Sequence, residues 1–238
     1  MANFKTRART LDLLGRQQIA GIPTAINELL KNAHDAYADH VDIDYFRRKS
    51  LFIIRDDGVG MSRTDFENRW LTLGTESKVQ HTNASLPPVD ESKKFRHQMG
   101  EKGIGRLAIA SIGKQVLIIT KAKNTNEITA AFINWQIFEL PGLNLDDIVV
   151  PTKTFQQIPD VDQVNSMKSE LLDSVDILFS KDSLSEEKYL EIKETITSFS
   201  ICPKTLSKKL IRFSAFDSND SGGTIFIISP VDEILNSD

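Results

Sequence analysis

The chain has 238 residues, of which 40% are hydrophobic and 26% charged, and its formal net charge is −4 at pH 7. This length is enough for one large domain or for a domain with an appendage, and the composition excludes a chain that is disordered throughout. The charge excludes a global basic field that would attract nucleic acid or an anionic membrane, and the apolar runs have the length of strands, not of membrane spans.

After an N-terminal arm at residues 1–21, the first half of the chain alternates helix and strand. A helix is predicted over residues 22–37, because apolar residues recur there at spacings of three and four. Strands are predicted over residues 41–46 and 51–54, and a short helix over residues 62–71.

The middle of the chain contains a long polar stretch. Residues 74–100 carry charges of both signs, which is typical of a loop. A loop of this length is uncommon in a compact domain unless it is functional or mobile. A helix that begins among glycines is predicted over residues 103–112, and two paired strands are predicted over residues 116–120 and 128–138.

The last third of the chain contains two charged amphipathic helices, predicted over residues 164–179 and 185–199, and a final apolar strand over residues 224–228. One sheet with helices packed against it accounts for this order of elements. The predicted fold class is α+β, a two-layer α/β sandwich in which a mixed sheet is covered by helices on one face.

The first motif whose side chains could bind a ligand or catalyse a reaction is a polar face on the helix at residues 22–37. Glu28, Asn32 and Asp35 are spaced by four and three residues, so they share one face. A glutamate can take a proton from water, and an asparagine carbonyl oxygen can bind a hard cation. Taken alone, this face is better explained as the solvated side of an amphipathic helix.

The second motif follows an apolar strand directly and contains Asp56, Gly58, Gly60 and Met61. Glycines allow the backbone to approach a planar ligand closely, and a buried carboxylate can accept a hydrogen bond from an exocyclic amine. An ordinary Asp-Gly turn is the simpler interpretation of this motif alone.

The third motif is the glycine-rich segment at residues 100–106. Glycines before a predicted helix expose backbone N–H groups that can receive phosphate oxygens. The chain has no Gly-Lys-Ser/Thr sequence, which excludes a Walker loop. A polar loop precedes the glycines where a Rossmann motif needs a strand, so that interpretation is poor.

In this order, the three motifs resemble the GHKL superfamily, which has the Bergerat fold and includes gyrase, the heat-shock chaperone ATPase, histidine kinases and the MutL repair proteins. The resemblance covers residues 14–116, with one further short match at residues 222–228. Residues 73–78 are most similar to the chaperone and MORC-like branch.

The resemblance implies a role for each polar residue of the first two motifs. Glu28 matches the general base, and Asn32 matches the ligand of Mg²⁺. Asp35 matches a further acidic position, and Asp56 matches the carboxylate that reads the adenine amino group.

The resemblance also implies residues that shape the adenine site. Gly58 and Gly60 match the turn beside adenine, and Met61 matches an apolar contact to the base. Thr224, which follows Gly223, resembles the threonine that supports the adenine site.

The long polar loop then corresponds to a lid at residues 74–102, a part that moves to admit and trap nucleotide. Gly74 and Thr75 resemble the segment that opens this lid. The nucleotide phosphates are expected to be bound where the lid closes, by Gly100, Lys102, Gly103, Ile104, Gly105 and Arg106.

The expected function is Mg²⁺-dependent ATP binding with slow ATP hydrolysis. Glu28 favours a hydrolase, because histidine kinases of this superfamily usually carry asparagine at that position. Slow turnover is expected because related branches use a basic residue from a following domain at the γ-phosphate; Lys78, Lys102 and Arg106 are the local candidates. Two alternatives stay open: a nucleotide-gated dimerisation or binding module with little turnover, and a histidine kinase-like phosphotransfer domain.

The expected organisation is an arm at residues 1–21 and an ATP-binding domain at residues 22–238, with a helical insertion at about residues 160–215. ATP and ADP are the expected ligands, and no membrane contact is expected. The domain is expected to be the N-terminal module of a larger machine that forms a nucleotide-dependent homodimer and acts on DNA or a protein client through downstream domains. The single cysteine, Cys202, favours a reduced, cytoplasmic setting. A bacterial DNA-repair, restriction or phage-defence setting is a separate interpretation, which the cysteine does not carry.

Overall fold

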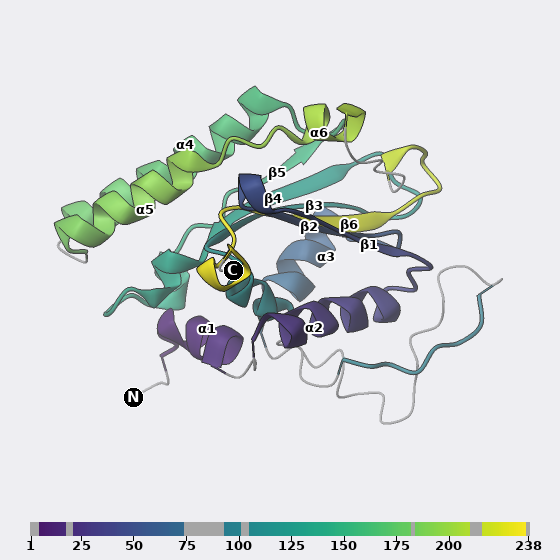
Figure 1. Cartoon of the computed structure of the whole chain (residues 1–238), viewed down its shortest axis with the longest axis horizontal. Coiled ribbons are helices and arrows are strands. Elements are labelled where there is room, and N and C mark those ends of the chain that lie inside the picture. Colours follow the sequence, from purple (N-terminus) through teal and green to yellow (C-terminus); the bar gives the residue numbers. More distant parts are fainter. Residues whose placement is uncertain are drawn as a thin grey trace.

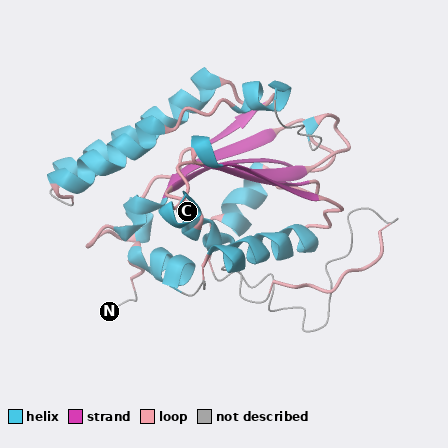
Figure 2. Cartoon of the chain, viewed as in Figure 1, coloured by secondary structure: helices cyan, strands magenta, loops and turns pink. Residues whose placement is uncertain are grey.

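The chain folds around one central sheet with helices on both sides of it (Figure 1). The computed structural model describes residues 5–17, 21–73, 93–100, 105–181, 184–209 and 216–236. Figure 2 shows the strands as a single layer between the helices. Within the described residues, no helix combines the length and the apolar character needed to cross a membrane.

The sheet has six strands in the order β1-β2-β6-β3-β4-β5, and every neighbouring pair is antiparallel. The strands are β1 (Val41–Phe46), β2 (Leu51–Asp56), β3 (Gln115–Lys121), β4 (Ile128–Asn134), β5 (Thr152–Phe155) and β6 (Gly223–Ile228). All residues of β3, β4 and β6 are buried, as their nearly continuous apolar sequences require. Because β6 lies between β2 and β3, a strand from the end of the chain meets two strands from its first half.

One face of the sheet is covered by the N-terminal helices. These are α1 (Arg9–Asp12), η1 (Leu13–Gln17), α2 (Ile22–Asp35), α3 (Arg63–Asp65), η3 (Phe66–Trp70) and η5 (Gly105–Ser111). Helix α2 buries Ala25, Leu29 and Ala33, which lie on one face of the helix. Its polar face is therefore turned away from the core.

The opposite face is covered by α4 (Val161–Ser180) and α5 (Glu186–Ser198), which run side by side in Figure 1. Phe199, just after α5, packs edge-to-face on Phe132 of β4 at a ring distance of 5.1 Å. The side chain of Gln115 donates a hydrogen bond to the carbonyl of Thr195 at 2.7 Å. The remaining helices are η2 (Arg47–Lys49), η6 (Trp135–Glu139), η7 (Leu145–Asp147), α6 (Pro203–Lys209) and α7 (Glu233–Asn236).

The predicted α+β class is confirmed, and two details of the architecture differ from expectation. The sheet is antiparallel throughout and not mixed. The helices α4 and α5 cover a second face, because side chains such as Phe132 make that face of β4 apolar and in need of cover. The strand expected at residues 128–138 ends at Asn134, whose side chain accepts the N–H of Gln136 at 3.0 Å and starts η6.

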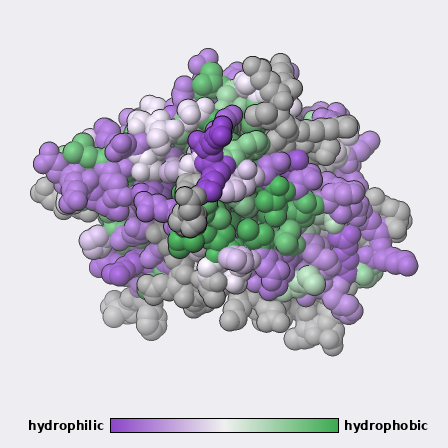
Figure 3. Space-filling view, in the orientation of Figure 1, coloured by the Kyte–Doolittle hydropathy of each residue, from purple (hydrophilic) through white to green (hydrophobic). Residues whose placement is uncertain are grey.

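The described part of the N-terminal arm packs against the domain. Ala8 is buried and its N–H donates to the carbonyl of Leu143 at 3.0 Å, while the guanidinium of Arg7 donates to the carbonyl of Gly142 at 2.6 Å. Figure 3 shows apolar atoms gathered in the middle of the visible face, over the edge of the sheet that β1 forms. The exposed large apolar side chains of β1 are Ile43 and Tyr45.

The contact between Phe199 and Phe132 predicts that α4 and α5 contribute to the stability of the whole domain. We expect Phe199→Ala to lower the free energy of unfolding by about 3–5 kcal/mol, because it leaves a cavity under the helix pair. Urea unfolding followed by circular dichroism measures this. Ile177→Ala, at an exposed position of α4, is the matched control and is expected to change little. Equal, small effects of both substitutions would show that the helix pair is not part of the cooperative core.

Candidate functional site

The polar face of α2 contacts the glycine-rich segment of the chain. One oxygen of Glu28, Oε1, accepts a hydrogen bond from the ammonium of Lys31 at 2.7 Å. The other oxygen, Oε2, lies 2.5 Å from the position that a Cβ on Gly105 would occupy. A side chain at position 105 would displace this carboxylate from its present position, so glycine at 105 lets Glu28 keep it beside this segment.

The carboxylate of Asp35 holds the other end of the same segment. It accepts the backbone N–H of Met99 at 2.8 Å and that of Gly100 at 2.9 Å. Seven residues of helix separate Asp35 from Glu28, which is about 10 Å along the axis. Gly100 and Gly105 therefore lie against two ends of one polar stripe, with Asn32 between them.

Part of the predicted site cannot be placed. Gly74, Thr75, Lys78, Lys102, Gly103 and Ile104 lie outside the described residues. Within the described part of the chain, the side chain of Asn32 makes no hydrogen bond, so its amide is available to a ligand. The structure thus brings together the first motif and the described ends of the third.

The second motif lies where three strands end side by side. Asp56 of β2 is paired with Thr224 of β6, and Thr224 is paired with Thr120 of β3. Residues directly opposite each other in antiparallel strands point to the same face, so these three side chains form a row. The hydroxyl oxygens of Thr120 and Thr224 are 3.0 Å apart, and Thr120 Oγ1 also accepts the N–H of Met61 at 2.9 Å.

Asp56 is a carboxyl group in a densely packed setting. Its Oδ1 accepts the N–H of Gly58 at 2.9 Å, and the N–H of Thr224 also donates to the carboxylate. The residue keeps some solvent exposure, yet burial of the carboxyl raises its pKa from 3.8 to about 7, against the opposing effect of these two donors. Near neutral pH this group can therefore change its charge when a hydrogen-bond donor binds beside it.

The glycines of the second motif permit close backbone contacts. Gly60 has a φ of +62°, and a Cβ at this position would lie 1.8 Å from the carbonyl oxygen of Lys121. A Cβ on Gly58 would lie 2.7 Å from the carbonyl oxygen of Ala36. The turn is thus pressed against the end of α2 on one side and the end of β3 on the other.

Asp57, the neighbour of Asp56, has a different role. Its Oδ1 accepts the N–H groups of Asp39 and His40 at 2.7 and 2.8 Å, and its Oδ2 lies 3.0 Å from the His40 ring. These hydrogen bonds outweigh burial and lower the pKa of Asp57, while Asp57 raises the pKa of His40. Asp57 therefore fixes the loop between α2 and β1, and Asp56 alone faces Thr224.

Arg106 joins the two described ends of the predicted lid. Its guanidinium donates to the carbonyl of Arg69 and, at 2.6 Å, to that of Thr72, close to where the lid was predicted to begin. Burial lowers the pKa of Arg106 to about 10, so the side chain stays charged at neutral pH. In this structure Arg106 binds the protein backbone, and its predicted contact with nucleotide phosphate stays a prediction.

Comparison with known proteins identifies the family of the chain that carries these residues. Residues 21–170 match the family described as histidine kinase-, DNA gyrase B- and HSP90-like ATPase. The chain belongs to this family. At the level of this family, the GHKL ATPase domain binds ATP. The buried carboxylate of Asp56 and the turn with Gly58 and Gly60 agree with this function.

Individual relatives match smaller parts of this GHKL domain. The chain is 34% identical over 103 residues to a protein of Herpetosiphon aurantiacus named "Putative type II restriction enzyme HgiDII". The aligned segment covers 43% of this chain and 15% of that protein. It is 30% identical over 135 residues to the ATPase morc-1 of Caenorhabditis elegans, 56% of this chain and 14% of the relative. It is 34% identical over 105 residues to the DNA mismatch repair protein MutL of Rickettsia bellii, 44% and 15% respectively. The chain therefore matches only about one seventh of the length of these relatives.

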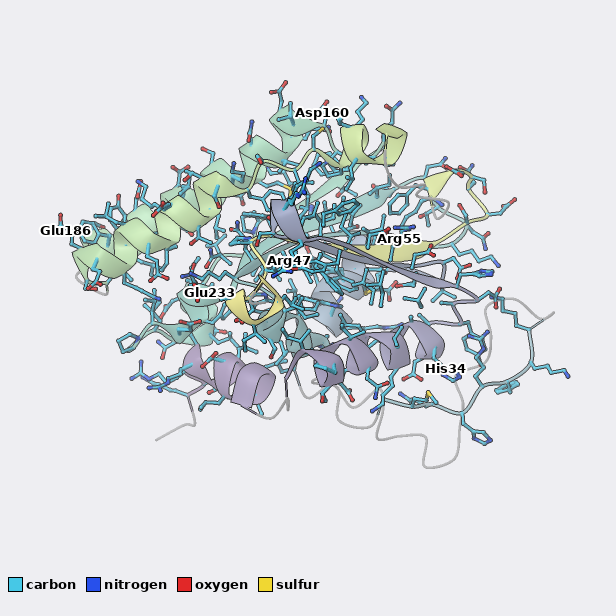
Figure 4. The ribbon with its side chains drawn as sticks, in the orientation of Figure 1. His34, Arg47, Arg55, Asp160, Glu186 and Glu233 are labelled. Atoms are coloured by element: carbon cyan, nitrogen blue, oxygen red, sulfur yellow. The ribbon has the colours of Figure 1, made fainter. Side chains whose placement is uncertain are left out.

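A segment of the predicted GHKL lid is docked at the end of α2. The ammonium of Lys93 donates to the carbonyl of Tyr37 and to Asp39, both at 2.8 Å, and Arg96 donates to Asp39 at 3.1 Å and to the carbonyl of Ala38 at 2.6 Å. Figure 4 shows His34 at this end of α2, beside the segment at residues 93–100. Sequence reasoning missed these lysine and arginine contacts, and it missed Thr120, because a threonine in an apolar strand carries no signal of its own.

The contrast between Asp56 and Asp57 predicts opposite effects of pH. The pKa of Asp56 is higher in the folded state, so ionising Asp56 opposes folding as pH rises from about 4 to about 7. We therefore expect Asp56→Asn to raise the free energy of unfolding at pH 8 by more than at pH 5, measured by urea unfolding without nucleotide.

Asp57→Asn is the matched control. The pKa of Asp57 is lowered on folding, so its stabilising effect is present above pH 4 and is lost only as pH falls through the folded pKa. We expect Asp57→Asn to destabilise the domain by about 1–3 kcal/mol at both pH values, because charged hydrogen bonds are lost. A destabilised Asp56→Asn protein at pH 8 would contradict the raised pKa of Asp56.

Proposed function

We propose that this chain binds ATP with Mg²⁺ and hydrolyses it slowly, with Glu28 as the general base. The observation that carries this proposal is the contact between Glu28 and Gly105, which places a carboxylate beside the segment expected to bind phosphates. A base within reach of the phosphates can take a proton from the attacking water, a role that a structural carboxylate on the far side of α2 could not fill.

The adenine end of the proposed site is the row formed by Asp56, Thr224 and Thr120. An ionised Asp56 would accept a hydrogen bond from the exocyclic amine of adenine, and the N–H groups of Gly58 and Thr224 would hold the carboxylate in place. Met61, whose N–H is fixed by Thr120, would contact the apolar face of the base.

The phosphate end is proposed to lie along the polar face of α2. Asn32 would hold Mg²⁺ through its side-chain oxygen, because Mg²⁺ prefers oxygen ligands and usually keeps several waters and substrate phosphates around it. The metal would supply charge neutralisation for the phosphates. Among the described residues no group of three His, Cys, Asp or Glu side chains could hold a metal.

The remaining predicted phosphate ligands keep their proposed roles. Asp35 would act through the backbone of Met99 and Gly100, whose N–H groups it holds. Lys102, Gly103 and Ile104 are proposed to complete the phosphate site with Gly105. Arg106 is proposed to link the segments on either side of the lid, and Lys78, Lys102 and Arg106 are the candidate sources of positive charge for the γ-phosphate.

The role of Glu28 predicts a loss of turnover without a loss of binding. We expect Glu28→Gln to lower the rate of ATP hydrolysis by about 10²–10⁴-fold, because an amide cannot accept the proton. Phosphate release measures turnover and calorimetry measures ATP affinity. The control is Glu67→Gln, an exposed glutamate paired with Arg63 at 2.8 Å, which is expected to leave both unchanged. Unchanged hydrolysis in Glu28→Gln would exclude Glu28 as the base.

A second candidate function is a nucleotide-gated dimerisation module with little turnover. The hydrogen bond from Lys31 favours it, since one oxygen of the proposed base is already engaged. The relatives named as MutL and MORC ATPases are several times longer than the matched segment, so action on DNA or on a protein client through further domains is also a proposal.

Mass in solution separates these two functions. We expect the module to be monomeric with ADP and dimeric with a non-hydrolysable ATP analogue, because a nucleotide with a γ-phosphate would favour the conformation of the proposed lid that a partner binds. Light scattering coupled to gel filtration measures this, and the protein without nucleotide is the control. A monomer under all three conditions, together with measurable hydrolysis, would leave the hydrolase and remove the nucleotide-gated dimer.

A further inference from the structure

We propose that Lys121 is a positioning residue for adenine recognition, in that its ammonium fixes the loop Ser218–Ser221 and so sets the backbone of Gly222, Gly223 and Thr224. This inference rests on the proposed function, since it concerns the adenine end of that site. Lys121 belongs to none of the three sequence motifs and touches the proposed site only through the backbone.

The ammonium of Lys121 is bound by backbone carbonyls. It donates to the carbonyl of Ser218 at 2.8 Å, to that of Asn219 at 3.3 Å and to that of Ser221. A lysine has three N–H donors, so each donor has one carbonyl acceptor. The residue is 3% exposed, and burial lowers the pKa of its ammonium. A charge kept in such a place must be compensated by the carbonyl dipoles around it, which ties the loop to this side chain.

The loop leads directly into the strand that supports Asp56. Lys121 is paired with Gly223, and the preceding residue, Thr120, is paired with Thr224. Neighbouring residues of a strand point to opposite faces, so Thr120 holds β6 from the side of α2 while Lys121 holds the preceding loop from the other side. The N–H of Thr224, which donates to Asp56, is only three residues from the carbonyl of Ser221.

The backbone beside this loop has no space to absorb a displacement. A Cβ on Gly222 would lie 2.8 Å from the carbonyl oxygen of Val59 and from the backbone nitrogen of Lys123. A Cβ on Gly60 would collide with the carbonyl oxygen of Lys121 itself. A movement of the loop toward the site would therefore shift the turn beside adenine.

The outer side of the loop is open. A pocket of about 320 Å³ borders it, with Lys121, Gln156 and Asn219 among its lining residues. Without the ammonium, the carbonyls of Ser218 and Asn219 would keep other donors, the hydroxyl of Ser221 and the N–H of Asn124. All three carbonyls would still lose a charged donor, and the loop could relax into this space. The lysine therefore adds a charged link to β3 in a loop that is also held by the N–H of Asn124 and by the hydrogen bonds between Ser218 and Ser221.

The test compares two nucleotides that differ at the edge of the base. ADP carries the exocyclic amine that Asp56 is proposed to accept, and inosine diphosphate carries an oxygen there. We expect Lys121→Met to weaken ADP binding about tenfold, the size expected for one lost hydrogen bond to a charged group, and to change inosine diphosphate binding far less. Calorimetry with Mg²⁺ measures both affinities, and their ratio is the readout. Lys114→Met, at a half-exposed lysine next to the other end of β3, is the matched control and should leave the ratio unchanged.

The outcomes separate this inference from the proposed function. If the wild-type protein binds neither ADP nor ATP, the proposed function fails. If it binds and Lys121→Met keeps the wild-type ratio, whether or not both affinities fall, the positioning role of Lys121 is overturned. Should Lys121→Met not fold, Lys121→Gln, which keeps two N–H donors, gives the same test: a reduced ratio supports the inference and an unchanged ratio overturns it.

Discussion

The site depends on one carboxyl group that is buried where three strands end. Asp56 lies at the end of β2, and it is held by N–H groups from its own turn and from Thr224 of β6. This arrangement requires that β6, from the end of the chain, lie between β2 and β3. It also requires glycine at positions 58 and 60, because a side chain at either would collide with backbone from α2 or β3. The topology of the sheet and the glycines of the turn thus serve the same group.

Local pattern was enough to predict most elements of the fold but not their arrangement. The periodicity of residues 22–37 predicts α2, and the continuous apolar runs predict β3 and β6, because these patterns follow from burial along a single element. Which face α4 and α5 cover is decided by long-range contacts such as that of Phe199 with Phe132, which no local pattern contains. The same limit applies to strand direction, which depends on which strands become neighbours.

A site residue could be proposed from the sequence where it belongs to a motif. It could not be proposed where only the pairing of two strands brings it to the site. Glu28 and Asp56 were proposed as site residues because their spacing to glycines resembles a known family. The family match confirms that resemblance, and the roles of the two residues stay predictions. Thr120 and Lys121 could not be found, since their roles arise from the register of β3 against β6. Arg106 was predicted to bind phosphate, and this stays a prediction; the structure adds that its guanidinium donates to the carbonyls of Arg69 and Thr72. A charged residue beside a glycine-rich segment is compatible with both roles.

Binding and hydrolysis make separate demands on this structure. The proposed adenine end is largely preformed, because Asp56, Thr224 and Thr120 are connected by hydrogen bonds. The proposed base is partly engaged, since Lys31 donates to Oε1 of Glu28, while Oε2 lies beside Gly105 in space that a Cβ at position 105 would fill. Binding of a water to Oε1 would compete with the Lys31 contact, and the segment between Gly100 and Gly105 is proposed to contact the nucleotide. Hydrolysis in such a site would follow a rearrangement that binding alone does not require, which is the physical basis for expecting tight coupling between turnover and conformational change.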